Sequence, residues 1–230
     1  MRNIDTHRMY MGGVKQLLAG SMLAVICLFA TGSQAAIAFQ QLPLNGSDIY
    51  PSILTEQTAD DFTLSTNGIL NTFTWWGSYA EDPAILPDDQ FRISLFKNNG
   101  DESPTTQPFA SLTESVSRSL TGLVEATGKS IFQFEMAIPR PIHLTAANSY
   151  YVSIVNQFGQ NDVNAYWYWL LGDETGSNYF RFSDNDAWQN EPTGNMAFTV
   201  STVVPLPSAI GFWLTGSALI GLIGRKKRES

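Results

Sequence analysis

Two runs of consecutive aromatic residues are the side chains of this chain most suited to contacting a ligand. They are Trp75-Trp76-Gly77-Ser78-Tyr79 and Tyr166-Trp167-Tyr168-Trp169, and a single Trp188 follows. Successive side chains of a strand point to opposite faces of a sheet, so each run places rings on both faces, and only one face can be the core. Rings on the outer face would form a platform on which sugars stack, because exposed aromatic patches usually have partners. The candidate glycan-binding residues are Trp76, Tyr79, Trp167, Trp169 and Trp188, and the alternative is that these rings pack in the core and beneath its edges.

Carboxylates in a predicted turn are a candidate cation site. Asp184-Asn185-Asp186 places oxygen atoms at alternate positions of a loop, and Ca²⁺ takes roughly six to eight oxygen ligands. The segment lacks the spacing and the terminal glutamate of an EF-hand loop, and Asp and Asn also favour turns through bonds to their own backbone. Asp184 and Asp186 are therefore candidate ligands of a structural Ca²⁺, with an ordinary turn as the alternative, and no other cofactor is predicted.

The residues needed for most catalytic sites are missing between the two ends of the chain. Its one cysteine, Cys27, lies in the N-terminal apolar run, and His143 is the one histidine of residues 37–204. Cysteine-histidine nucleophiles and multi-histidine metal sites are thereby excluded, and no G-x-S-x-G motif is present. Paired carboxylates could hydrolyse a glycoside, but nothing in the sequence pairs Glu135 with a partner. The sequence predicts a protein that is not an enzyme, and a secreted glycoside hydrolase is the least favoured alternative.

The apolar pattern predicts that an all-β domain over residues 37–203 positions these side chains. Apolar residues alternate with others in the ranges 72–76, 91–96, 132–138, 150–155, 180–182 and 196–201. Period-2 alternation indicates strands with one buried face, and Gly, Pro, Asn, Asp and Ser separate the runs as turns. Six such runs without a long helical pattern predict an antiparallel β-sandwich of the jelly-roll type. Residues 110–128 are dense in Ser and Thr, and we expect irregular structure there, with a short helix as the alternative.

Residues 1–36 have the order of parts of a secretory signal peptide. Basic residues precede an apolar run from Leu17 to Ala30, which we expect to be a helix, and small residues follow it. This order of a basic flank, an apolar run and an A-x-A-like ending directs export through the Sec translocon. Cuts after Ala35 and after Ala38 both fit, and a permanent N-terminal anchor is the alternative.

Residues 204–230 predict a weak membrane anchor. A proline motif precedes an apolar run at 209–224, and a basic cluster follows; these residues are Val204, Pro205, Leu206, Pro207, and then Arg225, Lys226, Lys227 and Arg228. A transmembrane helix over these 16 residues is about 24 Å long, slightly short of the roughly 30 Å hydrocarbon core of a bilayer. Basic residues favour the cytoplasmic side, so we expect the domain outside the inner membrane and the chain end inside. An ordinary C-terminal anchor is the alternative.

This tail resembles the PEP-CTERM sorting signal, in a Val-Pro-Leu-Pro variant. The resemblance implies processing by an exosortase-type enzyme of a Gram-negative bacterium, a transient inner-membrane anchor, and delivery to the cell surface or extracellular matrix. The body also resembles a recurrent bacterial extracellular β-sandwich domain often found with this signal, through segments such as Ala59-Asp60-Asp61-Phe62 and Asn195-Met196-Ala197-Phe198. The second resemblance implies a fold and a location but no activity.

The net charge of the predicted domain limits the classes of partner that it can bind. Residues 37–204 contain six Lys and Arg and nineteen Asp and Glu, a net charge of −13. Such an acidic body argues against nucleic acid and anionic membrane surfaces as partners. Because exosortase systems accompany exopolysaccharide production, the resemblance to the PEP-CTERM signal implies an exported structural or adhesive protein associated with exopolysaccharide. A carbohydrate-binding module using exposed aromatic residues is the alternative.

Overall fold

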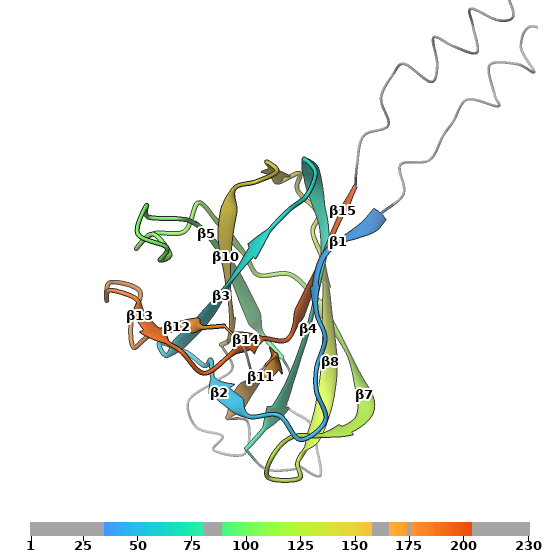
Figure 1. Ribbon diagram of the computed structural model, residues 1–230. Coiled ribbons are helices and arrows are strands. Elements are labelled where there is room, and N and C mark those ends of the chain that lie inside the picture. Colours follow the sequence, from blue (N-terminus) through green and yellow to red (C-terminus); the bar gives the residue numbers. More distant parts are fainter. Residues whose placement is uncertain (1–34, 81–88, 158–165, 174–175, 204–230) are drawn as a thin grey trace, which may run out of the picture. The chain divides into compact units, whose positions relative to one another are not determined.

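The computed structural model describes residues 35–80, 89–157, 166–173 and 176–203 (Figure 1). Residues 35–204 form one compact unit, which is the unit described below. The predicted signal helix and the whole predicted tail, with its helix at 209–224 and its sorting motif, lie outside the described residues. No helix in the described part of the chain is both long and apolar enough to span a membrane.

Strands make up the regular structure of the described ranges. Their bounds are β1 (Ala35–Gln41), β2 (Ile49–Pro51), β3 (Gln57–Thr63), β4 (Gly68–Tyr79), β5 (Phe91–Lys97), β6 (Ala110–Leu112), β7 (Val116–Val124), β8 (Ser130–Ala137), β9 (His143–Leu144), β10 (Ser149–Asn156), β11 (Trp167–Asp173), β12 (Asn178–Arg181), β13 (Gln189–Glu191), β14 (Asn195–Met196) and β15 (Phe198–Val203).

These strands form two antiparallel sheets. The smaller sheet has the order β13-β12-β3-β10-β5-β6. The larger sheet contains β1-β15-β4-β11-β14, with β8, β7 and β9 on the other side of β4 and with β2 beside β11. Trp75 of β4 lies opposite Phe198 of β15 on one side and Phe134 of β8 on the other. The larger sheet curls into a half-barrel, as the β1-β15-β4-β8-β7 side of Figure 1 shows. The prediction of an all-β domain with antiparallel sheets is therefore confirmed.

An aromatic cluster joins the two sheets. Trp75 stacks on Phe134 with ring centroids 5.7 Å apart, and Phe91 of β5, in the other sheet, meets the Trp75 ring edge-on at 5.0 Å. Phe91 also meets Trp167 of β11 at 5.0 Å. All four side chains are fully buried, and burial of a large apolar side chain contributes roughly 1.5–3 kcal/mol. These rings are a main source of stability in a domain whose described residues include no cysteine.

The prediction of irregular structure at residues 110–128 is wrong. This range contains β6 and the nine-residue β7, which pairs with β8 through Arg118↔Phe134 and its neighbours. β7 pairs with no other strand, and half or fully exposed residues alternate along it. Ser and Thr suit such a solvated edge strand, so the strand lacks the apolar alternation that identifies a half-buried one.

Candidate functional site

The predicted aromatic platform is not exposed. Trp167 and Trp169 are 0 % exposed, and Tyr79 is 2 % exposed, because all three rings point into the core between the sheets. Trp76 points to the other face of the larger sheet, where Ile49 and Leu123 pack against it. These four rings therefore do not form an outward sugar platform, because three are buried between the sheets and Trp76 is covered on the other face.

Trp188 has a structural contact as well. Its ring lies 4.2 Å from the Arg181 guanidinium carbon, and its indole N–H donates to the Thr105 carbonyl at 3.2 Å. The ring is half-buried under the 98–108 loop, which covers the outer face of the smaller sheet through these contacts and through the Arg181 bond to Thr106. Trp188 is thus part of the packing of this loop.

The second aromatic run contains two tyrosines, Tyr166 and Tyr168, that the sequence analysis did not select. They lie on the more accessible side of the run. Tyr166 and Tyr168 are half-buried, and their ring centroids lie 5.3 Å apart at 48°. The Tyr166 hydroxyl donates to Glu56 at 2.8 Å, and burial together with this carboxylate raises the pKa of Tyr166 to about 12. Because these tyrosines alternate with Trp167 and Trp169, the sequence indicates that the two pairs lie on opposite faces of the strand. It does not indicate which pair faces the core.

Of the two candidate Ca²⁺ ligands, Asp184 contacts a glutamine and two arginines, whereas Asp186 is exposed. The Asp184 carboxylate accepts hydrogen bonds from Gln57 at 2.6 Å and from Arg92 at 3.2 Å, and it pairs with Arg181 at 3.4 Å. Burial alone would raise the pKa of Asp184, but the Gln57 bond and the Arg92 charge outweigh it and lower the pKa. Asp186 is exposed, and no cluster of three or more His, Cys, Asp or Glu that could hold a metal ion occurs among the described residues. This arrangement uses Asp184 as an arginine partner.

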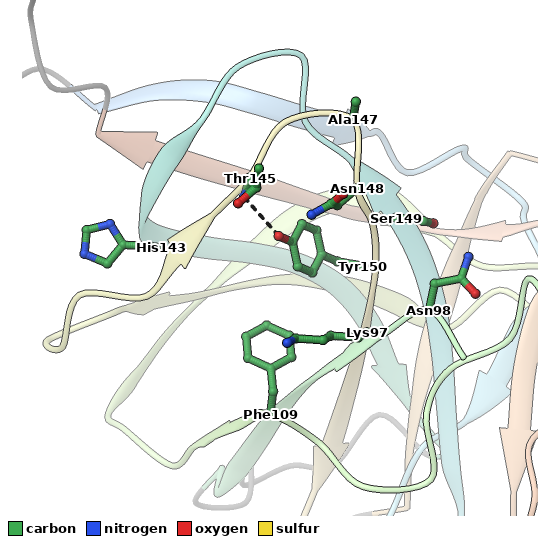
Figure 2. Close-up of a pocket in the computed structure, with 9 residues that line it drawn as sticks. All are labelled: Lys97, Asn98, Phe109, His143, Thr145, Ala147, Asn148, Ser149 and Tyr150. Carbon is green, nitrogen blue, oxygen red and sulfur yellow. Dashed lines mark hydrogen bonds between the residues drawn. The ribbon is translucent and has the colours of Figure 1, made fainter. Parts of the chain in front are cut away.

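A polar groove lies where β5 ends and β10 begins (Figure 2). Its volume is about 690 Å³. The described residues that line it are Lys97, Asn98, Phe109, His143, Thr145, Ala147, Asn148, Ser149 and Tyr150. Figure 2 shows the Tyr150 ring between the His143 and Asn98 sides of the groove, with Thr145 above and Lys97 and Phe109 below. The groove is thus a concave site lined by both polar and aromatic side chains.

The turn between β9 and β10 positions Tyr150. The Thr145 N–H donates to the Tyr150 hydroxyl oxygen at 2.9 Å, and Ala147 takes a φ of 59°, a left-handed conformation that is unfavourable for a side chain other than glycine. Bonds from Ala146 to Asn67 at 2.8 Å and from Ala147 to the Leu64 carbonyl at 3.1 Å hold this turn in place. Such backbone strain persists only where surrounding contacts maintain it, and these two bonds do so here.

Electropositive groups surround the Tyr150 hydroxyl. Burial disfavours its ionised form, but hydrogen bonds from Thr145 and Asn148 and the Lys97 charge outweigh burial and lower the pKa of Tyr150. Lys97 lies opposite Tyr150 in the β5–β10 register, and its ammonium is 5.9 Å from the Phe109 ring centroid. Together with Asn98, Asn148 and His143, the groove offers a cation, several hydrogen-bond donors and an exposed aromatic ring. These groups suit an oxygen-rich ligand.

The described residues that line the groove include no carboxylate. His143 is exposed and is the one titratable base among the lining residues apart from Lys97 and Tyr150, and none of the nine residues is Asp or Glu. General acid–base hydrolysis of a glycoside needs two carboxyl groups, which this groove does not contain.

The fold and the groove define an all-β domain with a polar surface site. The chain belongs to the family described as Domain of unknown function (DUF7901), which matches residues 37–209. Comparison with curated proteins finds no match.

Proposed function

We propose that this protein is an exported structural or adhesive protein, a jelly-roll-type β-sandwich that holds exopolysaccharide in the groove around Tyr150. The groove carries the proposal, because it combines the exposed Phe109 ring with amide, hydroxyl and ammonium groups in one concavity. Sugars are bound by such a pairing of an aromatic surface with fixed polar groups. The protein is not an enzyme under this proposal.

The delivery route rests on the sequence of the two ends. The signal-like residues 1–36 direct export, and the Val204-Pro205-Leu206-Pro207 variant, the apolar run and the basic end resemble a PEP-CTERM tail. The domain would be anchored transiently in the inner membrane, processed by an exosortase-type enzyme, and released to the cell surface or matrix of a Gram-negative bacterium. In the domain itself Ala35 lies opposite Val203 in the β1–β15 register, so both connections start at one end of the same strand pair. That geometry suits a domain that is processed on both sides close to a membrane.

A second candidate function is a carbohydrate-binding module that uses the tyrosine pair. Tyr166 and Tyr168 are half-buried and adjacent, and Glu56 beside them can accept a hydrogen bond from a sugar hydroxyl. This pair replaces the five aromatic residues first predicted, of which four are buried and Trp188 is covered.

Affinity electrophoresis of the 35–204 domain through gels containing different polysaccharides tests binding. We expect retardation on at least one polysaccharide, and we expect Phe109→Ala to abolish it. Phe182→Ala is the matched control, because Phe182 is also an exposed phenylalanine, at 57 %, and does not line the groove. Loss of retardation only in Tyr168→Ala would assign binding to the tyrosine pair, and no retardation on any polysaccharide would reject the glycan partner.

Cell fractionation tests the delivery route. Replacing both Pro205 and Pro207 with alanine is expected to leave the protein in the membrane fraction, whereas the unaltered protein reaches the surface or medium. Equal distribution of the two proteins would contradict sorting by this tail.

A further inference from the structure

We propose that the groove holds the carboxylate of a uronic-acid-type sugar residue and that Lys97 is its counter-ion. This inference rests on the proposed glycan-binding function and names the class of sugar. The groove is a local exception in an acidic domain, whose residues 37–204 carry a net charge of −13, because its nine lining residues include a lysine and no Asp or Glu.

Lys97 differs in its partners from three arginines of the domain. Arg92, Arg118 and Arg181 each pair with an aspartate, at 3.2, 2.6 and 3.4 Å. Lys97 makes no ion pair with any carboxylate of the described ranges, and its charged end lies near the Phe109 ring instead. A lysine in this setting is available to pair with an anion that enters the groove.

The position of Lys97 directs its charge into the groove. Residues directly opposite in an antiparallel pair project on the same face, with Cβ atoms roughly 4.5–5.5 Å apart. Lys97 is opposite Tyr150, and its charge acts on the Tyr150 hydroxyl. An anionic group placed beside that hydroxyl would therefore lie within reach of the ammonium.

The remaining groups of the groove suit the rest of a sugar. Phe109 is 39 % exposed and offers a ring face for stacking, while the amides of Asn98 and Asn148 can bond hydroxyl groups. A cavity of about 690 Å³ is within the roughly 300–1,000 Å³ range of small-ligand pockets, and so accommodates a short saccharide.

The acidic surface of the domain limits how many charges the ligand carries. Exposed charges are largely screened beyond about 8–10 Å at physiological ionic strength, so one carboxylate at Lys97 experiences mainly its near neighbours. A long run of carboxylates would meet the acidic surface outside the groove. The preferred ligand is therefore a short oligosaccharide, such as a trisaccharide, of which one carboxylated unit lies in the groove.

Titrations of the isotope-labelled 35–204 domain with trigalacturonate, monitored by NMR, test this inference. The domain contains both sheets and their core, and its circular dichroism spectrum and melting temperature verify the fold of every variant. We expect the backbone signals of Asn98, Thr145 and Asn148 to shift, and we expect the Kd to rise at least about tenfold in Lys97→Gln, as for loss of a charge-assisted hydrogen bond. Lys97→Arg should restore most of the affinity.

Lys129→Gln is the matched control. Lys129 lies in the turn before β8, whereas His143 of the groove follows the other end of that strand. We expect the control to bind trigalacturonate as the unaltered domain does. An equal loss in Lys97→Gln and Lys129→Gln would show a general charge effect and overturn the inference.

The carboxyl-reduced trisaccharide, which is neutral, separates this inference from the proposed function. If it binds as tightly as trigalacturonate and Phe109→Ala abolishes binding, the glycan function stands and the carboxylate inference is wrong. If acetate alone shifts the same signals with the same Kd, the groove takes an adventitious ion only, and the inference is again wrong. If neither saccharide binds, and no polysaccharide retards the domain in the gels, both proposals fail.

Discussion

Arg181 is the most enclosed cation of the described ranges. Its side chain is 1 % exposed and lies against the Trp188 and Phe96 rings. Its guanidinium donates to the Gln57 amide oxygen at 2.9 and 3.1 Å and to the Thr106 carbonyl at 2.8 Å. A planar group with several donors in fixed directions meets these acceptors at once, which a lysine ammonium cannot do.

We therefore expect Arg181→Lys to lower the free energy of unfolding by about 2–4 kcal/mol, because the acceptors around it would be left unpaired. Urea unfolding followed by tryptophan fluorescence measures the change. Arg140→Lys makes the same substitution at an exposed position and should change stability by less than about 0.5 kcal/mol. Equal losses in the two variants would mean that the Arg181 contacts contribute little.

Asp60 is a buried carboxylate, and its exposed fraction is 0 %. Burial raises its pKa well above the usual range, and the nearby Asp61 charge adds to this, although N–H groups of Met196 and Asp61 donate to it at 2.6 and 2.8 Å. A folded pKa above the unfolded value means that the folded state keeps a proton that the unfolded state releases. The stabilisation is complete below the unfolded pKa of about 3.9 and is lost as the pH rises through the folded pKa.

The Asp60→Asn variant should remove this part of the pH dependence. We expect the unfolding free energy of the unaltered domain to fall as the pH rises above about 4, and we expect a flatter profile in Asp60→Asn. Urea titrations at several pH values between about 4 and 8 measure both profiles. Asp101→Asn, at an exposed loop position, should keep the fall; a profile of Asp60→Asn parallel to that of the unaltered domain would refute the assignment.

At the scale of elements, Gly77 sets how closely β11 approaches β4. A Cβ atom at this position would lie 2.4 Å from the Tyr168 carbonyl oxygen and 2.5 Å from the Trp167 ring. The Trp167 ring is in the core and the Tyr168 carbonyl belongs to the strand backbone, so neither can move aside without disturbing the sheet. A glycine is required here by contact, since its φ is not left-handed.

Gly77→Ala should therefore lower the unfolding free energy by about 3 kcal/mol or more, through overpacking at the β4–β11 junction. In a domain of this size that loss corresponds to roughly 6–12 °C in melting temperature. Gly122→Ala is the control, because nothing lies within 4 Å of its added Cβ and it loses only about 1–2 kcal/mol from its φ of 79°. A melting temperature of Gly77→Ala equal to or above that of Gly122→Ala would contradict the close contact.

Local patterns predict some elements and miss others for a physical reason. Strands β5, β8 and β10 have one face in the core, and apolar alternation reveals them. β9, β13 and β14 are two or three residues long, too short for a period, and β7 is solvated at its edge. The type of fold therefore follows from the strands that face the core, while the edges depend on pairing partners elsewhere in the chain.

The candidate site was less predictable than the fold. The run Tyr166-Trp167-Tyr168-Trp169 places aromatic rings on both faces of its strand. The pairing of Trp167 with Tyr79 determines which face is buried. The groove depends on the register that places Lys97 opposite Tyr150, and the two residues lie far apart in the sequence. No local pattern specifies that register, so the groove could not be read from the residue types alone.

At the scale of the whole molecule, the excess of acidic residues acts against compactness. Residues 37–204 carry a net charge of −13, and like charges on a compact body repel one another. Added salt screens this repulsion, with a screening length of about 10 Å at 0.1 M. The exposed Arg92–Asp184 pair is weakened by the same salt, but exposed pairs contribute only about 0–1 kcal/mol. Net screening should therefore stabilise the domain.

We expect the melting temperature of the 35–204 domain to rise by a few degrees between about 10 and 200 mM NaCl, as screening relieves self-repulsion.

CaCl₂ and MgCl₂ at equal concentration should give melting temperatures within about 2 °C of each other, because Asp184 is paired with arginines and offers no ready oxygen cage. Mg²⁺ is the matched control, since it screens as Ca²⁺ does but requires a tighter octahedral geometry. A rise of more than about 5 °C specific to Ca²⁺, removed by chelator and by Asp186→Asn, would instead establish the Ca²⁺ site predicted at Asp184 and Asp186.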